Sequence, residues 1–358
     1  MPSHTAASDP PLSTSFTELV GIAHPIVQDA MGPHATDHLA AAVSNAGGLG
    51  TVSTPGRSPE PTEAARIFRE RIDNTVSLTS EPFAANVPTF RAMSGELSPV
   101  SVAYLHAVIE ARGSDSALER GLRVVTTSGG FPSELREAIR DAGLIHIQKV
   151  GSTRQAKKAE DAGVEAIIAA GYEMGGHTPG APVNTFVLVP NVTESVDIPV
   201  LLSGGARDGR SLAAALCLGA DGVAMGTRFI AAEEHRDWDP RYAQAVLRAR
   251  EGDDIVLDGG RVLRNRAVER LYARKPVALA GRVFGRFDRV QRLMTRVGEG
   301  ALLRAQRDGE VDRGIVAAGQ VASAIREIVR VADFVPSMAE EAARILDELW
   351  PRRIPTPH

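Results

Sequence analysis

A histidine that directly follows two adjacent glycines is the first candidate for chemistry in this chain. Gly175, Gly176 and His177 come shortly after 166–170, an apolar run typical of a buried strand closed by glycine. Paired glycines let the backbone turn sharply and approach a ligand without Cβ contacts. The imidazole would then face a bound molecule as a candidate catalytic group. The alternative is a glycine-rich turn that carries a solvated histidine.

Two more glycine turns point to a phosphate site. A Gly-Gly pair follows the apolar run 200–203, and a Gly-Thr pair follows the run 222–225. Each turn precedes a predicted helix, so backbone N–H groups and the threonine hydroxyl form a concave set of donors suited to a phosphate. Tight turns without a ligand are the alternative. The candidate cofactor-binding residues here are Ser203, Gly204, Gly205, Met225, Gly226 and Thr227.

Other strand ends offer a flatter, more mixed surface. Gln28, Ala30 and Met31 close the first predicted strand with a polar edge and a soft apolar face. Asn86 ends the third strand, and its amide both donates and accepts hydrogen bonds, as the edge of a flavin ring requires. Lys149, in the fifth strand, could reach the same cavity. Together with the phosphate site and the histidine, these residues predict FMN and a small organic substrate, although loop-capping or surface roles remain alternatives for Asn86 and Lys149.

The order of the elements must bring these residues to one edge. From residue 25, short apolar runs alternate with helix-like segments about eight times, which favours a parallel sheet covered by helices. Eight such units in roughly 200 residues fit an α/β fold of the closed (β/α)8 TIM-barrel type, with its ligand site at the C-terminal ends of the strands. The predicted strands are 26–30, 49–53, 83–87, 123–128, 145–150, 166–170, 200–203 and 222–225.

The alternation predicts four segments. Residues 1–15, rich in Pro, Ser and Ala, are expected to be a disordered lead-in, because no basic region followed by an apolar run marks a signal peptide. Residues 16–258 form the FMN-binding barrel core. Residues 259–313 form a basic helical insertion, and residues 314–358 return to the barrel as C-terminal helices, predicted at 321–331 and 336–349.

The insertion 259–313 is crowded with arginine, and its apolar residues recur at helical spacing, as in Val283, Phe287, Val290, Leu293, Met294 and Val297. This pattern predicts amphipathic helices that form a cap over the barrel. Their basic faces are either simply solvated or a landing surface for phosphate groups or an acidic carrier. The pattern leaves this choice open.

Bulk properties exclude several classes of function. The chain has 358 residues, is 43% hydrophobic and 23% charged, and carries a formal net charge of -4, which gives no argument for nucleic-acid binding. No apolar run reaches the roughly 18–20 residues of a membrane span. Cys217 is the only cysteine, so a disulfide or a cysteine-based metal site is excluded and no metal is expected. A reducing, cytoplasmic location fits, with a homodimer as one option for assembly.

The motifs, taken in order, resemble those of the nitronate monooxygenase (2-nitropropane dioxygenase) family over residues 16–334. The same motifs occur in FMN-dependent enoyl-acyl-carrier-protein reductases of type II and in related reductases that act on CoA thioesters. They therefore identify the superfamily better than they separate its members. The segments that carry the resemblance are Pro25–Met31, Ala41–Gly50, Gly171–His177, Ile198–Gly205 and Leu218–Phe229.

The resemblance implies a TIM barrel with a smaller inserted domain and bound FMN. In nitronate oxidation, His177 would hydrogen-bond or deprotonate the substrate, while the flavin accepts electrons and O2 reoxidises it. In a reductase, the same histidine would polarise or protonate a thioester enolate. The resemblance places the phosphate on Gly204, Gly205, Gly226 and Thr227, and the flavin along Met31, Asn86 and Gly175.

Two positions depart from the family pattern. Ala170 stands where a glutamine is common, so that one hydrogen bond to the flavin is either missing or supplied by another residue such as Lys149. Asp29 stands where a small residue is usual. A carboxylate near a flavin would disfavour its anionic reduced form, unless the side chain faces the barrel wall.

The leading hypothesis is therefore an FMN-dependent oxidoreductase that oxidises alkyl nitronates with O2. The second is a reductase of an enoyl or ring-containing acyl thioester, carried on ACP or CoA, with NAD(P)H as electron donor; the basic insertion and the run 309–320 favour it mildly. Two other classes stay open: a non-redox lyase or isomerase that uses the phosphate site for its substrate, and a flavin-binding protein without turnover.

Overall fold

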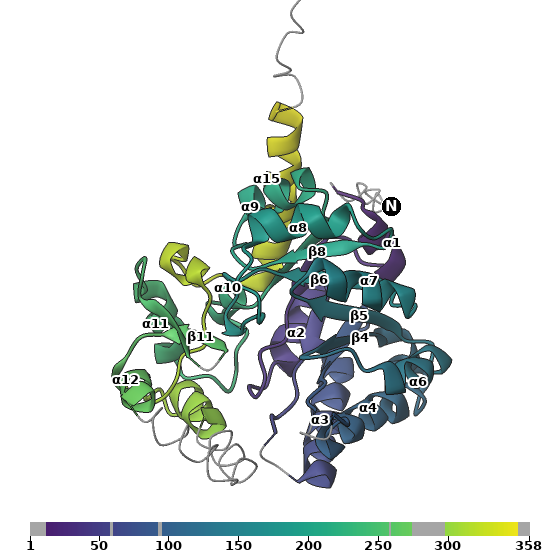
Figure 1. Ribbon diagram of the computed structural model, residues 1–358, viewed down its shortest axis with the longest axis horizontal. Coiled ribbons are helices and arrows are strands. Elements are labelled where there is room, and N and C mark those ends of the chain that lie inside the picture. The colour runs from purple at the N-terminus through teal and green to yellow at the C-terminus, as the bar shows by residue number, and fades with distance from the viewer. Residues whose placement is uncertain (1–11, 58–59, 92–94, 258, 274–297, 350–358) are drawn as a thin grey trace, which may run out of the picture.

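The computed structural model describes residues 12–57, 60–91, 95–257, 259–273 and 298–349. Within these ranges eight parallel strands form one sheet in the order β1-β9-β8-β6-β5-β4-β3-β2 (Figure 1). Its two edges meet through a parallel bridge between Val27 and Leu49, which closes the sheet into a (β/α)8 barrel. The barrel strands are β1 (Ile26–Gln28), β2 (Gly50–Val52), β3 (Phe83–Pro88), β4 (Leu122–Ser128), β5 (Ile145–Val150), β6 (Ala166–Ala170), β8 (Val200–Ser203) and β9 (Gly222–Met225).

Each barrel strand, or the residue next to it, contributes at least one apolar side chain to the barrel interior. These side chains form a cluster with almost no exposure to solvent. Helix α1 (Ser15–Val20) adds Phe16 and Val20 to the same cluster, so it covers one end of the barrel. The ligand site is therefore left to the other end, where the strands finish. The strand side chains of the cluster are Val27, Leu49, Ala84, Val124, Ile147, Ala166, Ile168, Leu201 and Ala224.

Helices surround the sheet, and several of them begin at N-cap residues that the sequence contains. The Ser152 side chain accepts a hydrogen bond from the Gln155 N–H, as expected for an N-cap. The C-terminal helix α15 (Val331–Leu349) packs against α9 and α2. The remaining helices of this layer are α2 (Asp37–Asn45), α3 (Pro61–Leu78), α4 (Pro99–Arg112), α5 (Ser116–Gly121), η1 (Ser133–Leu135), α6 (Arg136–Asp141), α7 (Thr153–Asp161), α8 (Thr185–Thr193) and α9 (Gly209–Cys217).

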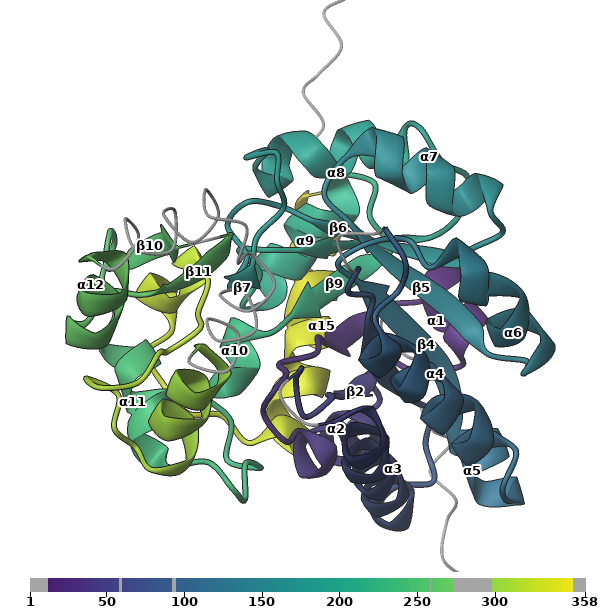
Figure 2. The ribbon, with the colours of Figure 1, turned by 60° about the horizontal axis from the view of Figure 1, so that its bottom comes forward.

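A smaller lobe lies beside the barrel, as Figures 1 and 2 both show. Its sheet has the order β10-β11-β7, and all its pairs are antiparallel. Strand β7 consists of Gly176 and His177, so the histidine of the glycine turn is held by the lobe as well as by the barrel. Residues 298–307 are also helical. The other elements of the lobe and of its link to the barrel are α10 (Thr227–Ile230), α11 (Pro240–Arg248), β10 (Asp254–Leu257), β11 (Gly260–Leu263), α12 (Arg266–Ala273) and η2 (Gln320–Ala324).

Three predictions from the sequence need correction. The disordered lead-in was predicted to reach residue 15, but Thr14 caps α1, which begins at Ser15. The insertion was predicted to be helical from residue 259, yet Gly260–Leu263 is a strand because it pairs with both β10 and β7. A helix was predicted for 321–331, but the structure has the short 3-10 helix η2 at the start of this range and the first residue of α15, Val331, at its end.

The apolar and basic positions of 282–297, which predicted the amphipathic cap helices, lie outside the described residues. In the part of the chain that is described, none of the helices has the length and apolar character needed to cross a bilayer. The same part contains no group of three or more His, Cys, Asp or Glu side chains placed to hold a metal ion.

Candidate functional site

A cavity of about 1870 Å³ opens at the C-terminal ends of the barrel strands. The barrel loops form one wall, and residues of the small lobe, among them Gly260, Glu299 and Ile315, form the other. The structure brings most of the predicted site residues together in this cavity. They are Ala30, Met31, Asn86, Lys149, Gly175, Gly176, His177, Ser203, Gly204, Gly205, Met225, Gly226 and Thr227.

Gln28 is the predicted cofactor-binding residue that does not line the cavity. Its side chain is fully buried, its Oε1 accepts a hydrogen bond from the Thr51 N–H at 2.9 Å, and its Nε2 donates to the Asp29 carbonyl. Strands β1 and β2 share little backbone pairing, so the Gln28 amide supplies a further link where the barrel closes. Gln28 is therefore a structural residue.

The glycine turns leave space that a ligand can fill. Gly204 and Gly205 have φ values of +111° and +85°, in the left-handed region that side chains rarely adopt. A Cβ placed on Gly205 would meet nothing within 4 Å, and one on Gly226 would meet only Met31 Cγ, at 3.8 Å. Both glycines line the cavity. The bare backbone at these two turns thus forms a cradle of the kind that phosphate-binding loops provide.

Thr227 completes this cradle. Its Oγ1 accepts a hydrogen bond from the Gly319 N–H at 2.9 Å. Because that contact uses the oxygen as an acceptor, the hydroxyl proton remains available for donation to a ligand. Thr227 therefore links the cradle to the segment that follows Ala318.

Helix α9 does not contribute its N-terminus to the cradle, contrary to the sequence-based expectation. The Asp208 side chain accepts from the Ser211 N–H, and Glu341 Oε2 accepts from the Gly209 N–H at 2.8 Å. Two carboxylates thus already occupy the positive end of this helix. The backbone donors left for the cradle are therefore those of the turn, whose Gly204 and Gly205 line the cavity.

Three contacts hold the turn that carries His177. The Glu173 carboxylate accepts hydrogen bonds from both the backbone N–H and the hydroxyl of Thr185, at the start of α8. The Gly175 backbone lies so close to the lobe that a Cβ there would come within 2.5 Å of Gly319 N. His177 pairs with Gly260 of β11. The histidine is thereby fixed from both sides of the cavity.

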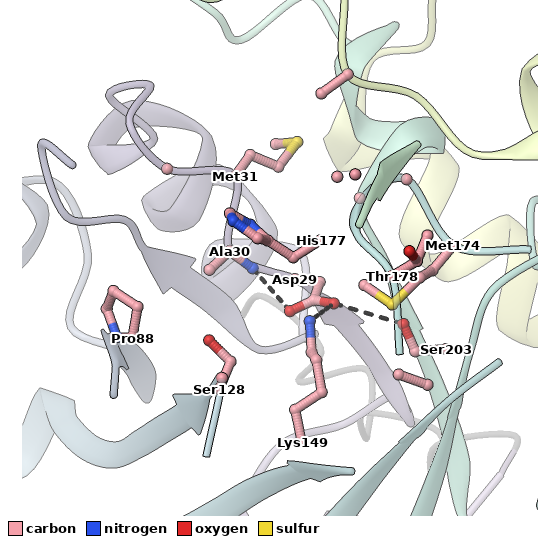
Figure 3. A pocket seen from close by; sticks show the side chains of 18 of the residues that line it. Asp29, Ala30, Met31, Pro88, Ser128, Lys149, Met174, His177, Thr178 and Ser203 are labelled. Atoms are coloured by element: carbon pink, nitrogen blue, oxygen red, sulfur yellow. Dashed lines mark hydrogen bonds and ion pairs between the residues drawn. The ribbon is translucent and has the colours of Figure 1, made fainter. Parts of the chain in front are cut away.

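The His177 side chain points into the cavity, to which it is exposed (Figure 3). The enclosing walls desolvate the charged form of the ring, and this lowers the pKa of His177 below its ordinary value. The positive charges of Arg57 and Lys149 lower the pKa further, whereas Glu299 opposes them. The neutral imidazole, which can accept a proton, is the form favoured at neutral pH.

Asp29 and Lys149 form an ion pair in the cavity, shown in Figure 3. Asp29 Oδ1 also accepts from the Ala30 N–H at 2.9 Å, and Ser203 Oγ lies 3.5 Å from Asp29 Oδ2. Lys149, predicted as a donor to the flavin, is therefore already engaged. Asp29 faces the cavity, not the barrel wall.

Asn86 presents one side of its amide to a ligand. Its Nδ2 donates to the Thr126 hydroxyl at 2.9 Å and to the Thr126 carbonyl at 3.2 Å. The side-chain oxygen Oδ1 of Asn86 is left as the acceptor for a bound molecule.

Several cavity residues were not anticipated from the sequence. Arg57 lies in the loop after β2, and its guanidinium sits 4.2 Å from the centre of the Phe90 ring. Trp238 and Tyr242 pack against His34 at a different part of the cavity. The only sequence signal for Arg57 is its position shortly after the predicted strand 49–53. The aromatic pair follows the eighth strand, in a segment without a recognisable motif.

Comparison with known proteins agrees with this geometry. Residues 13–341 match the family model described as nitronate monooxygenase. A solved structure of FabK from Thermotoga maritima has 32% sequence identity and a TM-score of 0.80, covering 95% of this chain and 99% of that one.

Two named relatives point to different reactions. The chain is 32% identical to a (3aS,4S,5R,7aS)-5-hydroxy-7a-methyl-1-oxo-octahydro-1H-indene-4-carboxyl-CoA dehydrogenase of Mycobacterium tuberculosis, over 92% of this chain and 96% of the relative. It is 31% identical to a probable nitronate monooxygenase of Staphylococcus saprophyticus, over 68% and 75% respectively. The fold, the site and these matches together establish that the chain is an oxidoreductase that belongs to the nitronate monooxygenase family.

Proposed function

We propose that this protein is an FMN-dependent oxidoreductase that oxidises alkyl nitronates with O2. The observation that carries the proposal is the placement of His177 in the same cavity as the glycine cradle of Gly204, Gly205 and Gly226. The cradle fits a phosphate because Gly205 and Gly226 leave open space and the Thr227 hydroxyl can still donate.

Each part of FMN has residues suited to it. Gly204, Gly205, Gly226 and Thr227 would hold the phosphate, and the Asn86 carbonyl oxygen would accept from the ring system, beside Met31 and Gly175. When bound, FMN supplies a two-electron acceptor that O2 can reoxidise. These assignments rest on the open cradle and on the acceptor that the Asn86 contacts leave.

His177 would act on the substrate by proton transfer or by a hydrogen bond. Its lowered pKa keeps the imidazole neutral, so the ring can hold the nitronate by a hydrogen bond or accept the proton that a neutral nitroalkane loses when it forms the nitronate. The β7–β11 pairing and the contact of Gly175 with Gly319 fix the backbone of His177. The enclosing walls reduce the water that competes for this proton.

An absorbance spectrum followed by anaerobic titration tests the proposal. The purified protein should carry a flavin spectrum with FMN released on denaturation, and propionate 3-nitronate should bleach it without O2. His177→Asn should retain FMN but be reduced roughly 10²- to 10⁴-fold more slowly, the usual contribution of a general acid or base. A colourless protein that does not take up added FMN would instead indicate a non-redox barrel.

A second candidate is reduction of an acyl thioester with NAD(P)H. The cavity volume of about 1870 Å³ favours it, because pockets for small molecules usually measure about 300–1,000 Å³. The room beyond one cofactor suits a long substrate, and one relative is named for a CoA thioester. Rapid anaerobic bleaching by NADPH or NADH, with no response to nitronates, would establish this reaction in place of the first.

We place the enzyme in the cytoplasm, since its sole cysteine, Cys217, fits a reducing compartment. A homodimer is the assembly to test first, by light scattering of the flavin-loaded protein at several concentrations.

A further inference from the structure

Arg57 is the cavity residue whose chemistry the proposed function does not yet use. It lies in the loop between β2 and α3, and two contacts hold this loop in place. The Tyr104 hydroxyl donates to the Gly56 carbonyl, and the Arg57 N–H donates to Glu299 Oε1 at 2.7 Å. The second contact ties a barrel loop to the small lobe across the cavity. The position of Arg57 is thus set by both halves of the molecule.

The Arg57 side chain is placed against an aromatic face. Its guanidinium carbon lies 4.2 Å from the centre of the Phe90 ring, and both residues line the cavity. A guanidinium stacked in this way keeps its N–H donors in the plane of the group, directed away from the ring. Within the described parts of the chain, no side chain forms a hydrogen bond or an ion pair of 4 Å or less with this guanidinium.

The charge of Arg57 acts on the catalytic histidine. Arg57 is half-buried, and this burial lowers its pKa, whereas the nearby charge of Glu299 raises it. The same charge lowers the pKa of His177, so the two groups belong to one electrostatic environment. Lys149, the other cation that lowers this pKa, is in contact with the carboxylate of Asp29. Arg57 is therefore a partly buried cavity cation that feels the charge of Glu299 but forms no hydrogen bond or close ion pair with a carboxylate of the described residues.

We propose that Arg57 binds a planar two-oxygen anion of the substrate and thereby positions the substrate beside His177. This inference rests on the proposed nitronate oxidation. A nitronate carries its negative charge on two oxygens of one nitrogen, and a guanidinium matches such a group with two parallel N–H donors. A carboxylate elsewhere on the substrate has the same geometry. The shared chemistry is the planar anion, and the choice of substrate separates its two sources.

The experiment uses the flavin-loaded protein with Arg57→Gln and Arg57→Lys. Nitrate, an inert planar anion, is titrated against the flavin spectrum, and steady-state kinetics are measured with ethyl nitronate and with propionate 3-nitronate. Arg57→Gln should weaken nitrate binding and raise KM roughly 10- to 100-fold, the loss expected for charge-assisted hydrogen bonds. Arg57→Lys should restore part of the loss. Arg66→Gln, which removes an exposed cation paired with Glu63, is the matched control and should change neither.

Equal losses for both nitronates would assign Arg57 to the nitronate oxygens, and a loss confined to propionate 3-nitronate would assign it to the carboxylate. Unchanged nitrate affinity and unchanged KM in Arg57→Gln would overturn the inference. If the wild-type protein oxidises neither nitronate while Arg57→Gln still loses nitrate binding, the proposed function fails and the anion site stands. Unaltered FMN content and melting temperature in the variants show that the loop has kept its fold.

Discussion

The carboxylate of Asp29, just after β1, is in contact with the ammonium group of Lys149 on β5, at the opposite side of the barrel. Their side chains are only 8% and 15% exposed, so the pair is largely shielded from water. Asp29 is one of the two residues that depart from the family pattern, and Lys149 is the cation expected to contact the flavin. The structure shows that the Asp29 carboxylate compensates the positive charge of Lys149.

Asp29→Asn should therefore release the charge of Lys149 toward the bound flavin. A cation near a flavin favours forms that carry negative charge, because opposite charges within a few ångström stabilise each other. The variant should bind sulfite, which forms an anionic adduct with flavins, about tenfold more tightly, a change of about 1.4 kcal/mol. Sulfite titration followed by absorbance measures this. Lys149→Gln should change the affinity in the opposite direction, and equal affinities in all three proteins would contradict the assignment.

The pH dependence of the reaction should reflect the environment of His177. Desolvation and the Arg57 charge lower its pKa, so the neutral base persists below the ordinary value of 6.5 and activity should fall only at more acidic pH. Removing the positive charge in Arg57→Gln should raise the pKa and move the acidic limb of kcat/KM to higher pH. Profiles of kcat/KM for both proteins test this, and a limb that moves to lower pH would show that the sign is wrong.

Gly175→Ala should damage the site without touching a catalytic atom. The added Cβ would lie 2.5 Å from Gly319 N and 2.6 Å from the Ala318 carbonyl carbon, both backbone atoms that cannot rotate away. We expect a loss of about 1–3 kcal/mol in the free energy of unfolding, as in other overpacked sites, together with reduced kcat. Gly180→Ala is the control, since a Cβ there meets nothing within 4 Å. Equal behaviour of the two variants would contradict the role of this contact.

The sequence predicted the barrel well where strands are buried on both faces. The bounds of β6, β8 and β9 agree with the predicted runs because short, largely apolar segments bounded by glycine or proline are typical of buried strands, and those of β5 agree although it contains His146, Gln148 and Lys149. The glycine turns at Gly204 and Gly226 followed from the position of these strands. Periodicity alone could therefore place the cavity and much of its wall.

The small lobe was harder to predict because its charges are buried. Arg261 lies in β11 and is only 3% exposed, since it pairs with Asp254 and stacks on the Tyr172 ring at 4.9 Å. In the sequence it is one of many arginines and suggested a solvated helix. The contact of Asp29 with Lys149 was equally hidden, because 120 positions separate the two residues. Such pairings depend on tertiary structure that no local pattern encodes.

Stability should fall in mild acid because three histidines are buried without charge. Burial lowers the pKa of His34 and His146 to about 3 and that of His235 to about 4. The unfolded chain, with pKa values near 6.5, binds more protons below that pH, so stability is full above about pH 6.5 and is lost as the pH falls toward 4. Three protons correspond to at most about 4 kcal/mol per pH unit.

Urea unfolding at several pH values measures this slope. His235→Gln should reduce it by up to one proton, because the glutamine amide can replace the contact of His235 with the Phe229 carbonyl but does not titrate. His106→Gln, on the exposed side of α4, is the control. A wild-type free energy of unfolding that stays constant between pH 7 and pH 5 would contradict the buried neutral state of these rings.

Thr227 should separate cofactor binding from catalysis. Its hydroxyl accepts from the Gly319 N–H and is expected to donate to the FMN phosphate. Thr227→Val removes the donor to the phosphate, so FMN should bind roughly tenfold more weakly. It also leaves the buried Gly319 N–H without its partner, which should lower the free energy of unfolding by about 1–3 kcal/mol. Thr227→Ser keeps the hydroxyl and should bind FMN almost as the wild type does. Fluorescence of released FMN on dilution gives the dissociation constants. If Thr227→Val binds FMN as tightly as the wild type does, the hydroxyl does not hold the phosphate, which must then be held by the glycine backbone alone.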